Sequence, residues 1–128
     1  MPSITPAYRN LTTSQPASVV QSSIDAALQT LDGRLTRSET NHVEYDLGSL
    51  LRSRFLGEFW VSRSTLPKKA IIQWESAESG TQIQVWVVDT HRFGFKWGFV
   101  DKYEIALSEV ADAIVAAIPG AVIAEAPG

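Results

Sequence analysis

The sequence predicts a two-layer α+β domain, in which two helices pack on one face of an antiparallel meander of four to five strands. The first observation is alternation: within residues 41–89, apolar and polar residues alternate in several short runs separated by turn residues. The second is that two segments, 16–31 and 101–118, carry apolar residues every three or four positions, as amphipathic helices do. Such elements bury the most apolar surface when both helices cover the same sheet face.

This order of elements resembles the β-α-β4-α and helix-grip arrangements found in several unrelated families, and the resemblance concerns topology alone. The chain has 128 residues, which is the length of one domain with a core of its own. We therefore expect a single domain over residues 1–128.

The N-terminal part is predicted to be an arm followed by a helix. Residues 1–13 are expected to form an extended arm or a short strand, which Pro6 would confine to a sheet edge. The helix over 16–31 is expected to begin at Ser14 as the N-cap and to end at Gly33, which can adopt a positive φ there.

The central part is predicted to be the sheet. The expected strands are 34–47, 50–63, 69–76 and 81–90. The last two are expected to form a hairpin through Glu78, Ser79 and Gly80, because glycine in such a short connection permits a tight turn.

The C-terminal part permits two interpretations. Residues 91–99 are either a loop or a fifth strand, since their aromatic residues alternate with glycines and basic side chains. The last helix begins either at Asp101, with Glu104 completing a capping box, or at Ser108 after a strand over 102–107. Residues 119–128 are expected to be a loose tail.

Composition excludes several classes of protein. The formal net charge of −3 argues against a nucleic-acid-binding protein, which needs a basic surface. No apolar run approaches the length of a transmembrane segment, and the N-terminus does not read as a secretory signal. With no cysteine and no phosphate-binding or dinucleotide-binding motif, we expect a cytoplasmic protein without a cofactor.

The alternation predicts a binding surface on the sheet face that the helices leave uncovered. If the core face contains the residues named at the end of this paragraph, then Trp60, Ile71, Trp86 and Val88 point outward. Tryptophan and arginine are favoured at interface centres, so this face is predicted to bind a second copy or another protein, with Arg52 and Arg54 at its rim. The alternative is that the arm, residues 91–99 or the tail covers these tryptophans. The expected core residues are Val43, Tyr45, Phe59, Val61, Ile72, Trp74, Ile83, Val85 and Val87.

A second hypothesis is a carrier or sensor of a small apolar ligand, held between the sheet and the last helix. Its mouth would be lined by Phe93, Phe95, Trp97 and Tyr103, because aromatic side chains close apolar cavities. The competing interpretation is that the alternating aromatic residues of 91–99 simply fill the core as a fifth strand.

A third hypothesis is a small enzyme that uses His42 or His91 with nearby carboxylates. His42, Glu44 and Asp46 would share one strand face, and Asp89 precedes His91 by two positions. A polar strand face and a polar turn explain both patterns more simply. We therefore predict no metal site and assign no catalytic residue.

Overall fold

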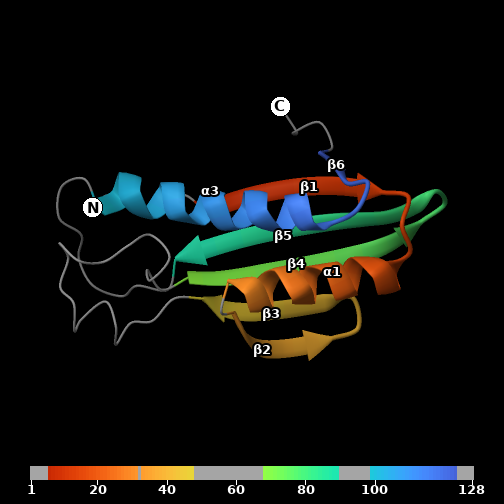
Figure 1. Ribbon diagram of the computed structural model, residues 1–128, viewed down its shortest axis with the longest axis horizontal. Coiled ribbons are helices and arrows are strands. Elements are labelled where there is room, and N and C mark those ends of the chain that lie inside the picture. The colour runs from red at the N-terminus through yellow and green to blue at the C-terminus, as the bar shows by residue number, and fades with distance from the viewer. Residues whose placement is uncertain (1–5, 32, 48–67, 90–98, 124–128) are drawn as a thin grey trace.

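The computed structural model describes residues 6–31, 33–47, 68–89 and 99–123. It contains six strands and two helices in the described part of the chain (Figure 1). Their bounds are β1 Ala7–Thr13, α1 Ala17–Thr30, β2 Arg34–Glu39, β3 His42–Leu47, β4 Lys68–Ala77, β5 Gly80–Asp89, α3 Phe99–Ala117 and β6 Val122–Ile123.

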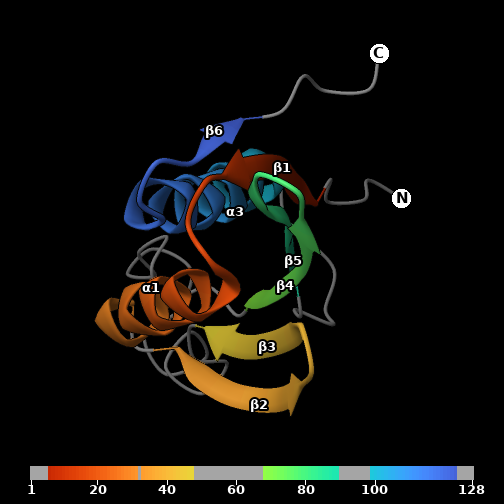
Figure 2. The same ribbon diagram turned by 90° about the vertical axis from the view of Figure 1, so that its right-hand side faces the viewer.

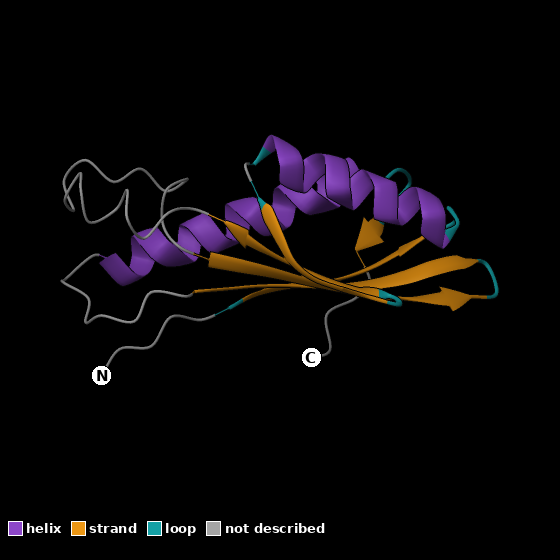
Figure 3. Ribbon diagram, turned by 90° about the horizontal axis from the view of Figure 1, so that it is seen from below, coloured by secondary structure: helices purple, strands orange, loops and turns teal. Residues whose placement is uncertain are grey.

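The strands form one antiparallel sheet in the order β2-β3-β4-β5-β1-β6. Both helices lie on the same side of this sheet, as the views from one end and from below show (Figures 2 and 3). The predicted α+β class and the two-layer arrangement are therefore confirmed. The number of strands and the order of elements differ from the meander that the sequence predicts.

The N-terminal arm is a strand inside the sheet, which corrects the prediction of an edge. β1 pairs with β5 along its whole length and with β6 at Leu11 and Thr12. Pro6 lies just before the strand begins, so its missing N–H costs the sheet no hydrogen bond.

The C-terminal residues up to Ile123 belong to the fold, which corrects the prediction that residues 119–128 form a loose tail. Val122 and Ile123 form β6 against β1, and the Thr13 hydroxyl donates a hydrogen bond to the carbonyl oxygen of Pro119, at 2.6 Å. Residues 124–128 lie outside the described part.

The segment 34–47 is a hairpin and not one strand. β2 and β3 are joined at Thr40 and Asn41, and Asn41 has a φ of 63°, in the left-handed region that asparagine tolerates better than most residues. A register shift between Leu35 and Arg37 interrupts the pairing. The predicted strand over 50–63 lies outside the described residues.

The β4–β5 hairpin confirms the prediction for residues 69–90. Trp74 pairs with Ile83, and the turn lies at Glu78 and Ser79. Gly80 has a φ of 145° and lies so close to β1 that a Cβ atom would overlap the carbonyl oxygen of Thr13. Only glycine fits this position.

The first helix lies where the sequence predicts it, but its ends differ. Pro16 is the N-cap and makes no side-chain capping bond, while the hydroxyl of Thr13 accepts the N–H of Gln15. At the other end the N–H of Gly33 bonds to the Leu28 carbonyl at 2.7 Å, and Gly33 does not have a positive φ.

The second helix, α3, begins at Phe99 and includes the segment 102–107, so a strand there is excluded. Phe99 is the first residue of α3 and not the end of a fifth strand. The remaining residues of the 91–99 segment lie outside the described part. The helix is not long and apolar enough to cross a membrane, and neither is α1.

The core lies between the helices and the sheet. Of the nine predicted core residues, the seven on β3, β4 and β5 are all buried, whereas Phe59 and Val61 lie outside the described part. They pack against fully buried helix residues such as Ile24 and Leu28 of α1 and Leu107 of α3. Each such aliphatic side chain contributes roughly 1.5–3 kcal/mol by leaving water. The helix layer is therefore held on by one continuous apolar interface.

Candidate functional site: the uncovered sheet face

The face of the sheet opposite α1 and α3, which we call the outer face, is covered by no described helix (Figure 3). Because side chains alternate along a strand, the residues between the buried ones point to this face. The pairing of the strands arranges them in rows that cross the sheet. Two central rows define the site: the tryptophan row of Arg37, Glu44, Ile71, Trp86 and Tyr8, and the amide row of Glu39, His42, Gln73, Gln84 and Asn10.

An aromatic pair lies in the tryptophan row. Tyr8 of β1 is directly opposite Trp86 of β5, and their ring centroids are 5.3 Å apart with the planes tilted by 42°. Ile71 of β4 is the next residue in the row, and all three side chains are half-buried. Large apolar groups held partly in water at the middle of a sheet face are typical of interaction surfaces.

Three neutral carboxamides form most of the amide row. Gln73, Gln84 and Asn10 lie side by side on β4, β5 and β1. Gln84 Nε2 donates to the Tyr8 hydroxyl at 3.4 Å, which ties the two rows together. The Oδ1 atom of Asn10 is occluded and has no hydrogen-bond partner among the described residues, an arrangement that costs free energy. Each carboxamide offers both donors and acceptors to an occupant.

A carboxylate with three cationic or imidazole neighbours marks the other end of the tryptophan row. Glu44 Oε2 is 2.7 Å from His42 Nε2 and 3.6 Å from Arg37 Nη1, and Glu44 Oε1 is 3.6 Å from Lys69 Nζ. The hydrogen bond from His42 lowers the pKa of Glu44, with the charge of Lys69 acting in the same direction against the effect of burial. Glu44 is therefore held as a carboxylate.

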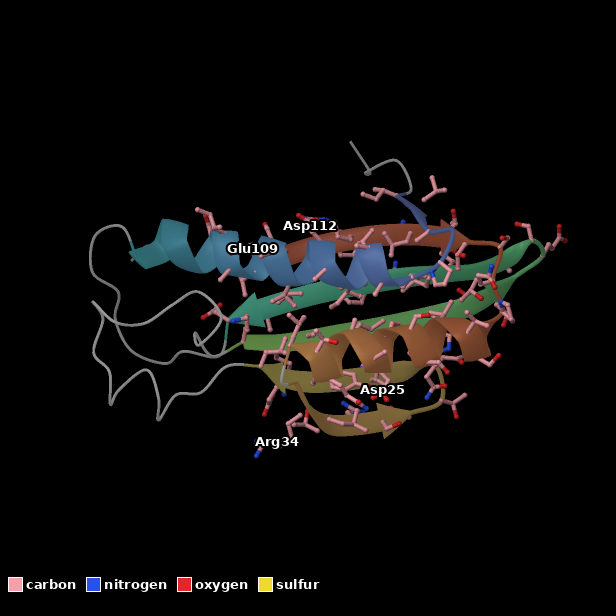
Figure 4. The ribbon with its side chains drawn as sticks, in the orientation of Figure 1. Asp25, Arg34, Glu109 and Asp112 are labelled. Atoms are coloured by element: carbon pink, nitrogen blue, oxygen red, sulfur yellow. The ribbon has the colours of Figure 1, made fainter. Side chains whose placement is uncertain are left out.

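Further ion pairs surround this cluster on β2 and β3. Arg37 Nη2 is 2.7 Å from Glu39 Oε1, and Arg34 Nη2 is 3.4 Å from Asp46 Oδ2. Arg34 extends from the β2 edge of the sheet (Figure 4). Exposed pairs of this kind contribute little to the stability of a fold.

His42 is not arranged as a general base. Gln73 Nε2 lies 3.0 Å from His42 Nδ1, and an amide donor there places the ring proton on Nε2, which donates to Glu44. Both ring nitrogens are thus engaged. The described residues contain no group of three side chains that could hold a metal ion. On β3, Glu44 pairs with His42 and Asp46 pairs with Lys69. His91 lies outside the described part.

The outer face brings together only some of the residues that the sequence analysis singles out. Ile71, Trp86 and Val88 lie on it and are half-buried. Trp60, Arg52 and Arg54 lie outside the described residues, and so do Phe93, Phe95 and Trp97. Tyr103 lies on α3, and its side chain is also outside the described part.

Over residues 104–117 of α3, apolar side chains pack against the sheet, in the region where the ligand hypothesis places its cavity. Leu107, Ala111 and Ile114 are fully buried there.

A charged side chain, that of Lys68 on β4, lies in the same layer and is 3% exposed. Burial lowers the pKa of Lys68 to about 8, although the charge of Glu109 acts to raise it. A buried amine at the end of a core strand is a cost to stability.

Sequence reasoning missed half of the aromatic pair. Tyr8 was expected in an arm, yet it lies on a strand, with Ala7, Leu11 and Thr13 buried and Tyr8 on the opposite face. Arg9 stands at the inner position between Ala7 and Leu11, where it pairs with Asp112 of α3, so residues 7–13 show no regular apolar alternation. Asn10 was missed for the same reason.

No protein-family model matches this sequence, and no curated protein is significantly similar to it.

Proposed function

We propose that the protein is a non-enzymatic assembly domain, which binds a second copy or another protein through the outer face. The observation that carries the proposal is the half-buried row of Tyr8, Trp86 and Ile71 on a face that no described helix covers. The engaged ring nitrogens of His42 favour binding over acid–base chemistry. As part of this proposal we place the protein in the cytoplasm, with which a chain lacking cysteine is compatible.

The surface has the composition of a docking site. Its centre is aromatic and neutral, and the charged groups of the two central rows lie toward the β2 edge in ion pairs that keep them from being left unpaired on binding. Trp86 would supply most of the apolar contact area, because tryptophan is the most common residue at the energetic centre of interfaces.

The test replaces Trp86 by Ser and measures association by native mass spectrometry, where assembly appears as multiples of the 14.0 kDa chain. We expect the variant to remain folded by circular dichroism and to associate at least about tenfold more weakly, the effect of losing an interface anchor of 1.4 kcal/mol or more. The matched control is Ile105→Ser, since Ile105 is 51% exposed on α3, in the helix layer.

Association of the Trp86 variant at wild-type strength would contradict the proposal. So would equal losses in the Trp86 and Ile105 variants, because the effect would then not belong to the outer face. If neither self-association nor the binding of any partner captured by the wild type depends on Trp86, the outer face is not a docking site.

A further inference from the structure

The charges of the outer face follow a regular pattern across the two central rows. On β2, Arg37 stands in the tryptophan row and Glu39 in the amide row; on β3, Glu44 and His42 occupy the same two positions. On β4 the pattern continues one row further out, with Lys69 beyond the tryptophan row. Glu75 lies beyond the amide row by the same distance. Arg37, Glu39, Lys69 and Glu75 thus each have an opposite charge at the position reflected through the line between the rows, and Glu44 has the His42 imidazole. Asp46, in the row of Lys69, has no charged counterpart on β3 and is paired within its own copy with Arg34 and Lys69.

A second copy related by a two-fold axis along that line would place each of these charges opposite the complementary group of the first copy. Such an axis runs across the strands and lies parallel to the sheet, so each strand faces the same strand of a second copy in the reverse direction. Arg37 would then face Glu39 of the second copy, and Lys69 would face Glu75. Glu44 would face the His42 imidazole. No two like charges of the described face would be opposed.

The neutral centre is complementary under the same operation. Trp86 would face Gln84 of the second copy and Tyr8 would face Asn10, so amide groups would lie over aromatic rings. Carboxamides are both donors and acceptors, and aromatic faces accept weak N–H contacts, so such a layer leaves no charge buried without a partner.

The other simple axis, parallel to the strands between β4 and β5, gives a poorer match. It places Ile71 against Trp86 of the second copy, which is favourable, but it also places Lys69 against Val88 and Glu44 against Tyr8. Two charges on each copy would lose water and gain no opposite charge there, which is costly.

Pairing through the edge strand is also disfavoured. All residues of β2 are exposed, yet the register shift between Leu35 and Arg37 breaks the regular alternation that a new partner strand would need. Bulges and charged side chains on an edge are the usual protection against such pairing.

The size of the face fits a reversible dimer. Five strands spaced by about 4.8 Å and four rows spaced by about 6.7 Å cover roughly 600 Å² on each copy, or about 1,200 Å² in total. Stable interfaces begin near about 1,200 Å², so the contact is at the lower end of that class.

From the charge pattern and the area, we propose that the occupant of the outer face is a second copy of this chain, docked face to face about the axis between the two central rows. This inference rests on the proposed function, because it names the partner of the same surface. It predicts a dimer that dissociates at roughly micromolar concentration and that weakens with added salt.

The test reverses one charge pair. Lys69→Glu and Glu75→Lys each place like charges opposite one another in the proposed dimer, so each variant alone should dissociate at least about tenfold more readily, as opposed like charges do. An equimolar mixture of the two variants restores the opposite charges, and one chain in the mixture carries an isotopic label. Sedimentation and native mass spectrometry should show heterodimers of near wild-type affinity.

A matched mixture separates this geometry from simple attraction between oppositely charged chains. Arg34→Glu and Glu78→Lys change the net charge by the same amounts, but the proposed axis does not bring these two positions together. This mixture should form no more heterodimer than random exchange of wild-type chains. Thermal unfolding of each variant checks that the loss of the Lys69 pairs with Glu44 and Asp46 has not unfolded the monomer.

Three outcomes would overturn the inference: a wild-type chain that stays monomeric at every concentration, single variants that dimerise normally, or a Lys69/Glu75 mixture that does no better than the matched mixture. The Trp86→Ser variant distinguishes a failure of this inference from a failure of the proposed function. If Trp86→Ser weakens association while the charge reversal is not rescued, the outer face docks a partner in another orientation. If Trp86→Ser has no effect, both proposals fail.

Discussion

Tyr8 and Trp86 lie directly opposite each other on β1 and β5, with ring centroids 5.3 Å apart. Tilted aromatic pairs at this separation attract each other beyond the area they bury, by about 0.5–1.5 kcal/mol. The contact joins the N-terminal strand β1 to the β4–β5 hairpin. It therefore links the stability of the fold to the surface that we propose for assembly.

We predict that this coupling is measurable in a double-mutant cycle. The free energies of unfolding of Tyr8→Ala, Trp86→Ala and the double variant, from denaturant titration, should give a coupling energy of about 0.5–1.5 kcal/mol. Tyr8→Phe is the control, because it keeps the ring and removes only the long hydrogen bond from Gln84. A coupling energy near zero would mean that the two rings do not interact in solution.

The Glu44 carboxylate should make stability depend on acid. Its pKa is lowered in the folded protein, chiefly by the hydrogen bond from His42. The stabilisation is therefore fully present above the ordinary carboxyl pKa and is lost as the pH falls through the lowered one. We expect Glu44→Gln to cost on the order of 1 kcal/mol at pH 7 and to converge with the wild type in acid.

The measurement is the free energy of unfolding as a function of pH for the wild type and Glu44→Gln. Glu75→Gln is the matched control, since it removes a carboxylate from the same sheet face outside the Glu44 cluster. If the difference between wild type and Glu44→Gln is the same at every pH, the hydrogen bond from His42 does not favour the ionised form.

Lys68 should weaken the protein below its lowered pKa. Burial lowers that pKa to about 8, so between this value and the ordinary lysine pKa the unfolded chain binds the proton more tightly than the folded one. Stability attributable to Lys68 therefore rises with pH through this window. We expect Lys68→Met to raise the free energy of unfolding at pH 7 by on the order of 1 kcal/mol, and to lose this advantage as the pH approaches 10.

The check is chemical denaturation at pH 7 and at pH 10, with Lys69→Met as the control. Lys69 is the next residue along β4, but its side chain lies on the outer face and is 32% exposed. A destabilised Lys68→Met variant would show that the ammonium group contributes more through its contacts than it loses by leaving water.

Gly80 should tolerate no side chain. Its φ of 145° is strained for any other residue, and a Cβ atom would meet the backbone of Thr13 and Ser14. We expect Gly80→Ala to lower the free energy of unfolding by about 2–4 kcal/mol, because β5 and β1 must move apart. Ser79→Ala, at the exposed neighbouring turn position, should change it by less than about 0.5 kcal/mol in the same thermal or denaturant unfolding experiment.

Local periodicity was a sufficient guide where apolar residues recur regularly on one side of an element. The apolar stripe of α1 and the alternation of the β4–β5 hairpin are both visible in the sequence, because each buried position recurs at a period that only one backbone geometry satisfies. β2 shows the converse. All its residues are exposed, so no apolar period marked where that strand ended and β3 began, and the turn at Asn41 was missed.

The place of β1 in the sheet could not be predicted in this way. Gln84 and Tyr8 are 76 residues apart, and nothing in the sequence near either residue specifies the other as its neighbour. For the same reason Asn10 and Tyr8 were absent from the predicted site, although Ile71 and Trp86 were in it.

The sequence by itself determined which residues of α1, β3, β4 and β5 face the core and which face away, because alternation and helical period are local properties of the chain. Only the tertiary structure decided which strands are neighbours, and with them the rows that cross the outer face. Tyr8 beside Trp86, and His42 beside Gln73, are products of strand order and register. Register is set by packing of the whole sheet against both helices, which no single segment encodes.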